Sequence, residues 1–341
     1  MLDARTQLLA DEFLKNVFGV KFKRQLPVSQ LFSTFANIAQ VGAAKENEFD
    51  LVIGDEAHRL WDYRRRKFRG MNKQLSITPM IQEVVRASKV TVLFLDENQS
   101  VRVNEIGNVE YIRGQIEQLG YGVELIDLTA QFRCLGSRSY LDWVDHVLGY
   151  GAPHSLSWID FDAYDFRVMN SMQDMQKSLD EAQGDGYSSR IVAGFCWNWS
   201  KVQGHGGLVH DVSDPRFEGW SAPWIEKTAP NVKSSEHRYF KWATDNSYSN
   251  QVGSIYSVQG FEFDYVGLIF GEDLVIRAGN WVGDLGKNKD PVFKSELRDN
   301  IEQAMDKLRN IYRVLLTRGM RGTFVYFLDE ETRDYFRRML G

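Results

Sequence analysis

Strand-length runs of apolar residues recur along this chain, and most of them are continuous rather than alternating with polar residues. Continuous runs are typical of strands buried on both faces, as in a parallel sheet covered by helices. Stretches with helical spacing separate them, most clearly 172–182 and 301–316. The pattern predicts an α/β fold with parallel sheets. The predicted strands are 49–56, 89–97, 123–128, 190–195, 252–258, 265–270 and 323–328.

The length of 341 residues allows two domains, since a typical domain has roughly 100–200 residues. We place the boundary near residue 128, which predicts domains 1–127 and 128–341, the second with an irregular insertion at about 198–250. No apolar run approaches the roughly 20 residues that span a bilayer, so we expect no membrane partner. The charged amino-terminal stretch is unlike a signal peptide, and two cysteines cannot form a disulfide framework. We therefore expect a cytoplasmic location.

Two predicted strands end in carboxylates, the first of them in LVIGDEAHRL at 51–60. Folds that hydrolyse nucleotides bind Mg²⁺ and activate a water with acidic residues that follow a buried strand. On this interpretation Asp55 binds the magnesium ion and Glu56 is the general base. The strand in VTVLFLDENQ ends at Asp96 and Glu97 and is followed by Gln99, whose amide is suited to contact a terminal phosphate or the attacking water.

Three later segments carry side chains suited to phosphate or ribose contacts. TAQFRC places Arg133 at the predicted domain start, where its planar guanidinium could bind phosphate oxygens. In VQGFEFDYVGLIF, Gly260 permits close backbone approach to a ligand, and Glu262 could accept from a ribose hydroxyl. The helix at 301–316 delivers Arg318 to its carboxyl end, with Arg321 shortly after. Such arginines either stabilise a transferring phosphoryl group or neutralise helix-end carbonyls, and both readings stay open.

These segments occur in one order, and that order resembles superfamily 1 helicases, most closely the Schlafen-group DNA/RNA helicase-like family of P-loop ATPases. The segments that carry the resemblance are 55–60, 96–99, 131–134, 258–267 and 316–319. The resemblance runs from about residue 49 to the carboxyl terminus. It implies two RecA-like parallel-sheet domains, the first incomplete at its amino terminus, with ATP and Mg²⁺ as ligands. It also implies single-stranded DNA or RNA as a partner.

The resemblance assigns a role to each candidate residue by its position in the motifs. It implies that Asp55 binds Mg²⁺ and that Glu56 activates water. The other implied assignments are Gln99 and Gly260 at the terminal phosphate, Glu262 near ribose or nucleic-acid contacts, and Arg133 and Arg318 as arginines of the second domain.

The family's first motif, a glycine-rich loop that ends in Gly-Lys-Ser/Thr, has no counterpart in this sequence. The sole Gly-Lys pair, Gly286-Lys287, continues to Asn288 and follows most of the other motifs. Backbone amides of that loop hold phosphates and its lysine neutralises them, so we expect this chain alone to be weak or inactive. Two explanations stay open. Either an upstream domain or partner carries the loop, or the chain is a non-hydrolysing nucleic-acid-binding or regulatory module.

Two further sets of residues have more than one interpretation. A formal net charge of −5 argues against binding nucleic acid by bulk charge, but a local basic surface is still compatible with it. The dense basic run at 64–69 is either a solvated loop or a nucleic-acid contact. The second set either stacks on bases or, as we favour, packs in the protein interior. It comprises Trp197, Trp199, Trp220, Trp224 and Trp242.

Overall fold

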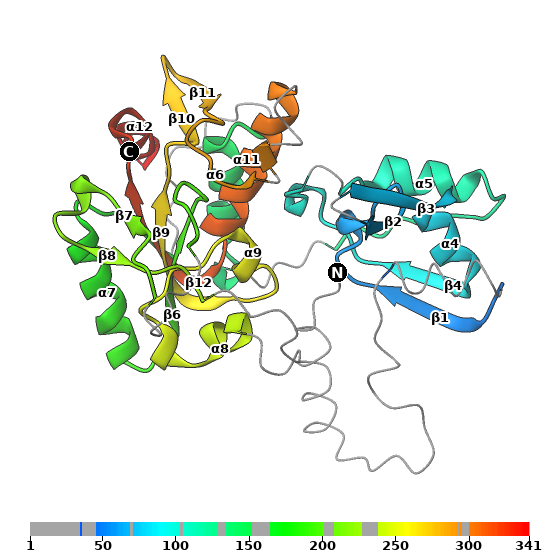
Figure 1. Ribbon diagram of the computed structural model, residues 1–341, viewed down its shortest axis with the longest axis horizontal. Helices are drawn as coiled ribbons and strands as arrows, with labels where there is room; N and C mark the ends of the chain where they lie inside the picture. Colours follow the sequence, from blue (N-terminus) through cyan, green and yellow to red (C-terminus); the bar gives the residue numbers. More distant parts are fainter. Residues whose placement is uncertain are drawn as a thin grey trace, which may run out of the picture. The chain divides into compact units, whose positions relative to one another are not determined.

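The computed structural model describes two compact units, which divide between Asp127 and Leu128 (Figure 1). For residues 64–68, 71–76 and 238–240 it describes the backbone alone. The described residues are 35, 46–68, 71–102, 105–128, 134–151, 164–200, 208–226, 238–291, 293–294 and 300–340.

Unit 1 contains a parallel pair of strands, a separate antiparallel pair and two α-helices among its described residues. The parallel strands β1 and β4 align Leu51 with Val90 and Ile53 with Val92. The elements in chain order are β1 (Phe49–Gly54), the 3-10 helix η1 (Ala57–Arg59), β2 (Tyr63–Phe68), β3 (Met71–Pro79), α4 (Met80–Arg86), β4 (Ser88–Leu93), the 3-10 helix η2 (Glu97–Gln99) and α5 (Val109–Glu117).

The two faces of the β1–β4 pair differ sharply in burial. On one face, Val52 packs with residues of α4 and α5, including Val84 and Ile112. The other face exposes apolar side chains at neighbouring register positions. They are Leu51 (50% exposed), Ile53 (62%), Val90 (54%) and Val92 (39%). Since parallel sheets are normally covered on both faces, this apolar surface has the character of an interior that no described residue covers.

Unit 2 is built on a four-stranded, all-parallel sheet in the order β5-β12-β9-β6. Its elements up to residue 250 are the 3-10 helix η3 (Cys134–Gly136), α6 (Arg138–Val147), β5 (Asp165–Val168), α7 (Met172–Gly184), β6 (Ser189–Ala193), β7 (Val212–Ser213), the 3-10 helix η4 (Pro215–Phe217), β8 (Ser221–Ala222), α8 (Arg238–Thr244) and the 3-10 helix η6 (Asn246–Tyr248). The elements that follow are α9 (Ile255–Val258), β9 (Phe263–Phe270), β10 (Leu274–Arg277), β11 (Asn280–Gly283), α11 (Ile301–Leu316), β12 (Gly319–Phe327) and α12 (Glu330–Leu340).

Helices cover both faces of this sheet (Figure 1). On one face, Met175 and Leu179 of α7 pack against Ile269 and other strand residues. On the other, Tyr312 of α11 stacks on Phe270 with ring centroids 3.8 Å apart. Strands buried on both faces must be apolar along their whole length, which explains the continuous runs in the sequence. The predicted α/β fold with parallel strands is confirmed.

Helix and strand predictions in unit 2 are largely confirmed. The helix predicted over 301–316 coincides with α11, and the one predicted over 172–182 extends two residues further as α7. The predicted strand 252–258 is wrong. Val252 and Gly253 form only single bridges, and the chain then turns into α9, where the Ser254 amide donates to Ser257 Oγ (2.7 Å). A serine side chain that accepts the N-cap amide favours helix initiation over strand continuation.

The predicted strand 123–128 is also wrong in the structure, because this segment makes no ladder. It follows α5 without a strand partner among the described residues, and Leu125, Ile126 and Leu128 are exposed. An apolar run becomes a strand only when a neighbouring backbone supplies its hydrogen-bond partners. The run therefore has the composition of a strand but pairs with no described strand.

Two of the five tryptophans at 197–242 lie in the interior of unit 2 and the other three pack partly buried against its core, so the favoured interpretation is confirmed in part. Trp224 and Trp242 are buried, and the indole of Trp224 donates to the Asn198 carbonyl (3.1 Å). Trp197 and Trp199 are partly buried against the same core. Indole N–H groups with carbonyl partners are characteristic of packed tryptophans.

Candidate functional site

The acidic turn follows β1 directly and has a distinctive backbone conformation. Glu56 adopts left-handed dihedral angles (φ 55°, ψ 42°), and its amide donates to Asp55 Oδ1 (2.9 Å). Glu56 Oε2 lies 2.9 Å from Nε2 of His58, whose ring is buried. Asp55 is exposed. The turn thus presents one carboxylate to solvent and holds the second against an imidazole.

The second acidic segment lies beside the first because β1 and β4 are parallel neighbours. The Ala57 amide donates to the Phe94 carbonyl (2.8 Å), which joins the two strand ends. Asp96 then caps η2, and its Oδ2 accepts from Gln99 Nε2 (2.7 Å). Gln99 is buried. The structure therefore brings Asp55, Glu56 and Gln99 to one edge of unit 1, where carboxyl ends of parallel strands form ligand sites in α/β folds.

Two residues outside the sequence motifs hold this edge in place. Buried Glu105 accepts at Oε2 from the amides of Val101 and Arg102 (3.0 Å each), and its Oε1 lies 3.5 Å from Arg59 Nε. A Cβ on Gly107 would lie 2.0 Å from the Ala57 carbonyl oxygen. These contacts depend on the folded loop, and no short sequence spacing identifies them in advance.

The donor chemistry at Asp55 fits a magnesium ion held as at nucleotide sites. There Mg²⁺ is bound through one or two carboxylates, waters and substrate phosphates rather than by a full protein cage. An exposed carboxylate at a strand end is a ligand of the type that this mode of binding uses. Within the described part of the chain, no cluster of three or more His, Cys, Asp or Glu residues could hold a metal.

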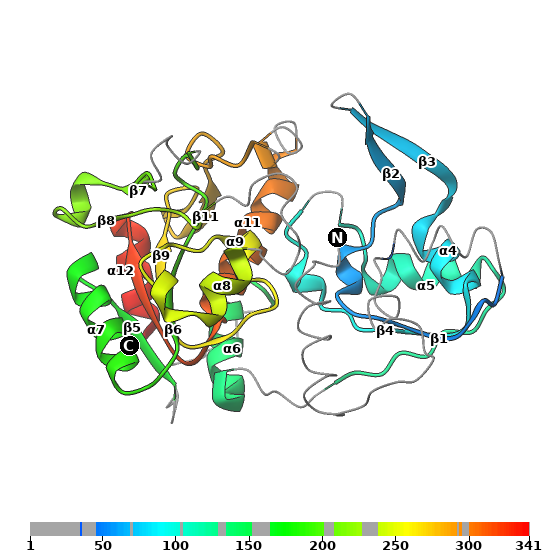
Figure 2. The ribbon, with the colours of Figure 1, turned by 60° about the horizontal axis from the view of Figure 1, so that its bottom comes forward.

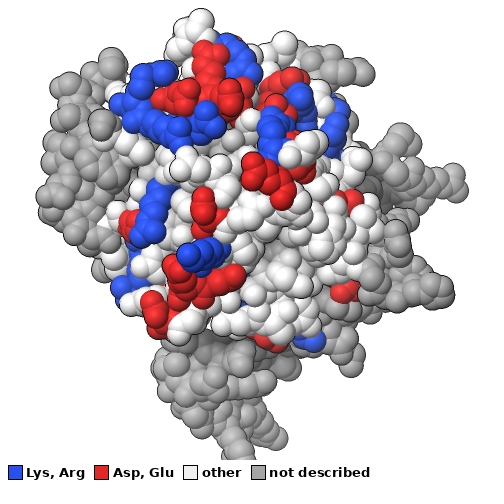
Figure 3. Space-filling model, turned by 90° about the vertical axis from the view of Figure 1, so that its left-hand side faces the viewer, with Lys and Arg blue, Asp and Glu red and all other residues white. Residues whose placement is uncertain are grey.

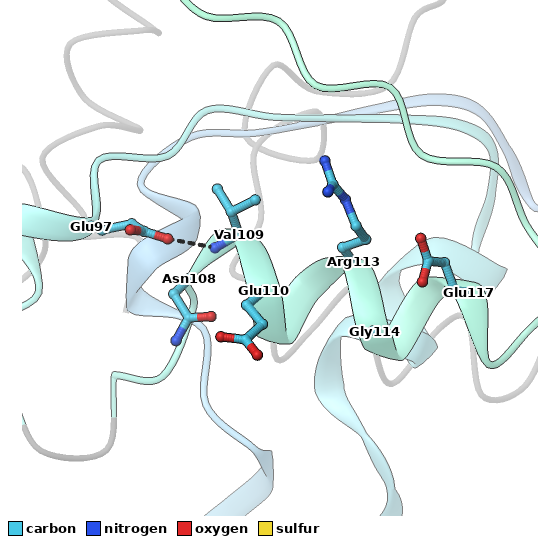
Figure 4. Close-up of a pocket in the computed structure, with 7 residues that line it drawn as sticks. All are labelled: Glu97, Asn108, Val109, Glu110, Arg113, Gly114 and Glu117. Atoms are coloured by element: carbon cyan, nitrogen blue, oxygen red, sulfur yellow. Dashed lines mark hydrogen bonds between the residues drawn. The ribbon is translucent and has the colours of Figure 1, made fainter.

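A hollow of about 600 Å³ lies beside α5, and its lining includes none of Asp55, Glu56 and Gln99 (Figure 4). Its wall includes Glu110, Arg113 and Glu117 of α5, and the carboxylate of Glu97, which accepts from the Val109 amide (2.7 Å). Glu97 thus caps the start of α5. A wall with three carboxylates and one arginine repels phosphate, so this hollow is a poor candidate for a nucleotide site.

Gly260 and Glu262 lie in unit 2, in the turn between α9 and β9. Gly260 has φ +85°, and no atom lies within 4 Å of the position a Cβ would occupy. Glu262 is exposed. The turn therefore needs glycine for its backbone conformation and leaves open space beside it, which is compatible with close approach of a ligand.

Arg318 immediately precedes β12 and Arg321 lies near its start, but their surroundings differ. Arg318 is 1% exposed, and its Nε donates to the Val314 carbonyl in the last turn of α11 (3.1 Å). This is the helix-end contact that the sequence left open as the alternative to a phosphate contact. The Arg321 side chain is 41% exposed, and its Nε donates to Asp264 Oδ1 (3.1 Å).

Asp264 is held by several donors at the amino end of β9. Its Oδ2 accepts from the amide and hydroxyl of Ser188 (2.9 and 2.8 Å). Burial would raise the pKa of Asp264, but the Ser188 donors and the Arg321 guanidinium outweigh it and hold the pKa below its usual value. Arg321 also lies over the Tyr187 ring, 4.8 Å from its centroid. The exposed guanidinium is thus fixed in position at the edge of the sheet.

Arg133 lies outside the described residues, but the turn that follows it is described. Cys134, Leu135 and Gly136 all have positive φ angles. Cys134 Sγ lies 4.0 Å from the Thr317 carbonyl, and the Tyr140 hydroxyl donates to the Leu316 carbonyl (2.8 Å). The structure therefore joins the segment that follows residues 131–133 to the end of α11.

Comparison with known proteins identifies related sequences. Residues 4–329 match the family described as Schlafen group 3, DNA/RNA helicase domain. The uncharacterized protein YPL245W of Saccharomyces cerevisiae is 23% identical over 316 residues, which are 85% of this chain and 64% of the yeast protein. The chain therefore spans less than two thirds of that relative. The four-stranded parallel sheet is consistent with a RecA-like α/β fold. In the described residues, we find no helix with the length and apolar character to cross a bilayer.

Proposed function

The chain belongs to the Schlafen group 3 DNA/RNA helicase domain family, and from this premise we propose that it is the motor part of an ATP-dependent helicase or translocase. Single-stranded DNA or RNA is the proposed partner, and ATP with Mg²⁺ the proposed ligand. The observation that carries the proposal is the pairing of the Asp55-Glu56 turn with the Asp96–Gln99 segment through Ala57 and Phe94.

The proposed chemistry divides between charge neutralisation and water activation. Asp55 would hold Mg²⁺, and the ion would supply positive charge to neutralise the phosphates during hydrolysis. Glu56 would accept the proton of the attacking water, and the buried His58 beside it restricts the orientation of its carboxylate. Gln99, oriented by Asp96, would contact the terminal phosphate or the water.

The residues of unit 2 complete the proposal. Gly260 provides a turn with open space for a ligand, and Glu262 an exposed carboxylate for ribose or nucleic-acid contacts. Arg321 offers a fixed, partly exposed guanidinium for phosphate. For Arg133 and Arg318, phosphate contacts implied by the family resemblance stay predictions.

The phosphate-binding loop is proposed to come from polypeptide outside this sequence, either an upstream domain or a partner. Among the described residues, nothing covers the apolar face of β1 and β4, and an added covering layer is compatible with this view. The face comprises Leu51, Ile53, Val90 and Val92. A parallel sheet normally has covering elements on both faces, and a covering layer here would lie against the strands that carry the acidic residues. This chain alone is then expected to bind ATP weakly.

The absence of a Gly-Lys-Ser/Thr segment also favours a second candidate function. In it, the chain is a non-hydrolysing nucleic-acid-binding or regulatory module on a helicase fold. Hydrolysis by a protein that includes the loop distinguishes the two candidates, because both predict nucleic-acid binding and only the first predicts turnover.

The test is ATP hydrolysis by the protein extended to include the loop, with and without single-stranded oligonucleotide. We expect stimulation by the oligonucleotide and a loss of at least about 10²-fold for Glu56→Gln, as for removal of a general base. Glu117→Gln, an exposed glutamate on α5, is the matched control and should keep the full rate. Full activity of Glu56→Gln would refute the assigned base. Nucleic-acid binding without any hydrolysis would establish the second candidate.

A further inference from the structure

We infer that the antiparallel pair β2–β3 is a nucleic-acid-binding ribbon that contacts the phosphate backbone. The inference rests on the proposed function and assigns one surface for its nucleic-acid partner. It concerns a segment that the acidic motifs and the arginines of unit 2 leave without a role.

The two strands form a sheet of their own, hydrogen-bonded to each other and to no further strand among the described residues. Figure 2 shows them extending away from α4, α5 and the β1–β4 pair. A two-stranded ribbon of this kind is marginally stable in isolation and gains little from its own packing. Ribbons with this architecture also serve nucleic-acid-binding proteins, where two strands enter a groove.

The charge of the ribbon is concentrated and of one sign. Residues 63–79 contain four arginines and two lysines and no aspartate or glutamate. The register places Arg66 opposite Lys73, so these two basic residues share one face, while Arg65 and Lys67 lie on the other. Like charges directly opposite each other destabilise a bare ribbon, and a bound polyanion would relieve that repulsion.

The described basic residues of unit 2 are arranged differently. On the face of unit 2 in Figure 3, basic and acidic side chains lie side by side. In unit 2, for example, Arg216 pairs with Asp214 and Glu272, and Arg277 with Asp329. The formal net charge of the whole chain is −5, so the ribbon is a positively charged segment of an acidic protein. Local basic surfaces on acidic proteins attract polyanions by complementary potential.

Arginine predominance favours nucleic acid over an acidic protein as the partner. The planar guanidinium matches the paired oxygens of phosphate and also stacks on bases, which ammonium groups do not. A polyacidic peptide offers carboxylates on a flexible chain without stacking surfaces, and it serves below as the competing class of partner.

The ribbon is anchored where it would be coupled to the acidic turn. At its base the Met80 amide donates to the Asp62 carbonyl (2.8 Å), and Tyr63 pairs with Pro79. Leu60, which closes the acidic turn, and Met80 belong to the same buried cluster. A shift of the ribbon on binding phosphate would therefore be transmitted to the turn that carries Asp55 and Glu56.

The test is binding of fluorescein-labelled oligo(dT) and oligo(U) by fluorescence anisotropy, as a function of salt between about 50 and 200 mM. The ribbon variant combines Arg65→Gln, Arg66→Gln, Lys67→Gln and Lys73→Gln. Each lost phosphate contact lowers the slope of log affinity against log salt by about 0.7 for a single strand. We expect the slope to fall by roughly 3 in magnitude and the affinity to fall at least about tenfold.

A control variant carries the same change in net charge elsewhere. It combines Arg138→Gln, Lys177→Gln, Arg333→Gln and Arg337→Gln, which lie on α6, α7 and α12. It should bind with the wild-type slope. A second ribbon variant, Arg65→Lys with Arg66→Lys, keeps the charge and should retain most of the slope. Circular dichroism and urea midpoints establish that each variant is folded.

The outcomes separate this inference from the proposed function. If the unchanged chain binds and the folded ribbon variant keeps the wild-type slope, the ribbon inference fails alone. If the unchanged chain binds no oligonucleotide, the proposed nucleic-acid function fails with it. If the control variant loses as much slope as the ribbon variant, bulk charge explains binding and the ribbon is not the site. Competition by polyglutamate as effective as that by oligonucleotide would assign the ribbon to acidic proteins instead.

Discussion

Gly107→Ala should detach the loop that holds the acidic turn in place. The added Cβ would lie 2.0 Å from the Ala57 carbonyl oxygen and 2.9 Å from the His58 Cα, and both atoms belong to the backbone. A backbone obstacle cannot rotate away as a side chain can, so the 105–107 segment or the turn must shift. Overpacking costs roughly 1–3 kcal/mol, and we expect the upper part of that range here.

Gly114→Ala is the matched control for the same chemical change in the same unit. Gly114 lies inside α5, and no atom lies within 4 Å of its added Cβ. Alanine in a helix interior is favoured over glycine by roughly 0.5–1 kcal/mol. The two glycine-to-alanine changes should therefore alter the free energy of unfolding in opposite directions.

Urea unfolding followed by pulsed hydrogen exchange in peptides of unit 1 measures the effect, because eight of the nine tryptophans lie beyond residue 127 and would dominate the fluorescence. With a slope of roughly 2 kcal/mol per molar urea, the Gly107→Ala midpoint should fall by about 1–1.5 M. Hydrogen exchange should rise most in peptides that cover residues 51–60. Equal midpoints for Gly107→Ala and wild type, or the same loss for Gly114→Ala, would refute the contact between this loop and the turn.

Two predictions concern unit 2. Tyr140→Phe removes the buried hydroxyl that donates to the Leu316 carbonyl (2.8 Å) and should lower the free energy of unfolding by roughly 1–2 kcal/mol, measured by urea denaturation. Ionised Asp264, bound by Ser188 and Arg321, has a folded-state pKa below its unfolded value, so its stabilisation is complete above the unfolded value and is lost as pH falls through the folded one. The stability gap between wild type and Asp264→Asn should therefore be widest near neutral pH and close in acid, and a gap that widens in acid would contradict this sign.

Some of this architecture follows from local sequence alone. Apolar runs of strand length, separated by stretches of helical spacing, predict the parallel sheet of unit 2 and the bounds of α11. The same runs predict that Asp55 and Asp96 follow strand ends, because a buried strand ends before charged residues that need solvent. Periodicity and composition act over a few residues, so these features can be predicted from them.

Other features were decided by contacts between distant residues. The strand-like run at 123–128 forms no ladder with any described strand, and 252–258 turns into α9 at Ser254. The position of Arg318 after a helix allowed either a helix-end contact or an exposed guanidinium, and the fold buries it against the Val314 carbonyl. Glu105 and Gly107 matter through the amides and carbonyl they meet in the folded loop. Apolar character and spacing are properties of the chain, whereas partners for backbone groups and room for a Cβ exist only once the chain has folded.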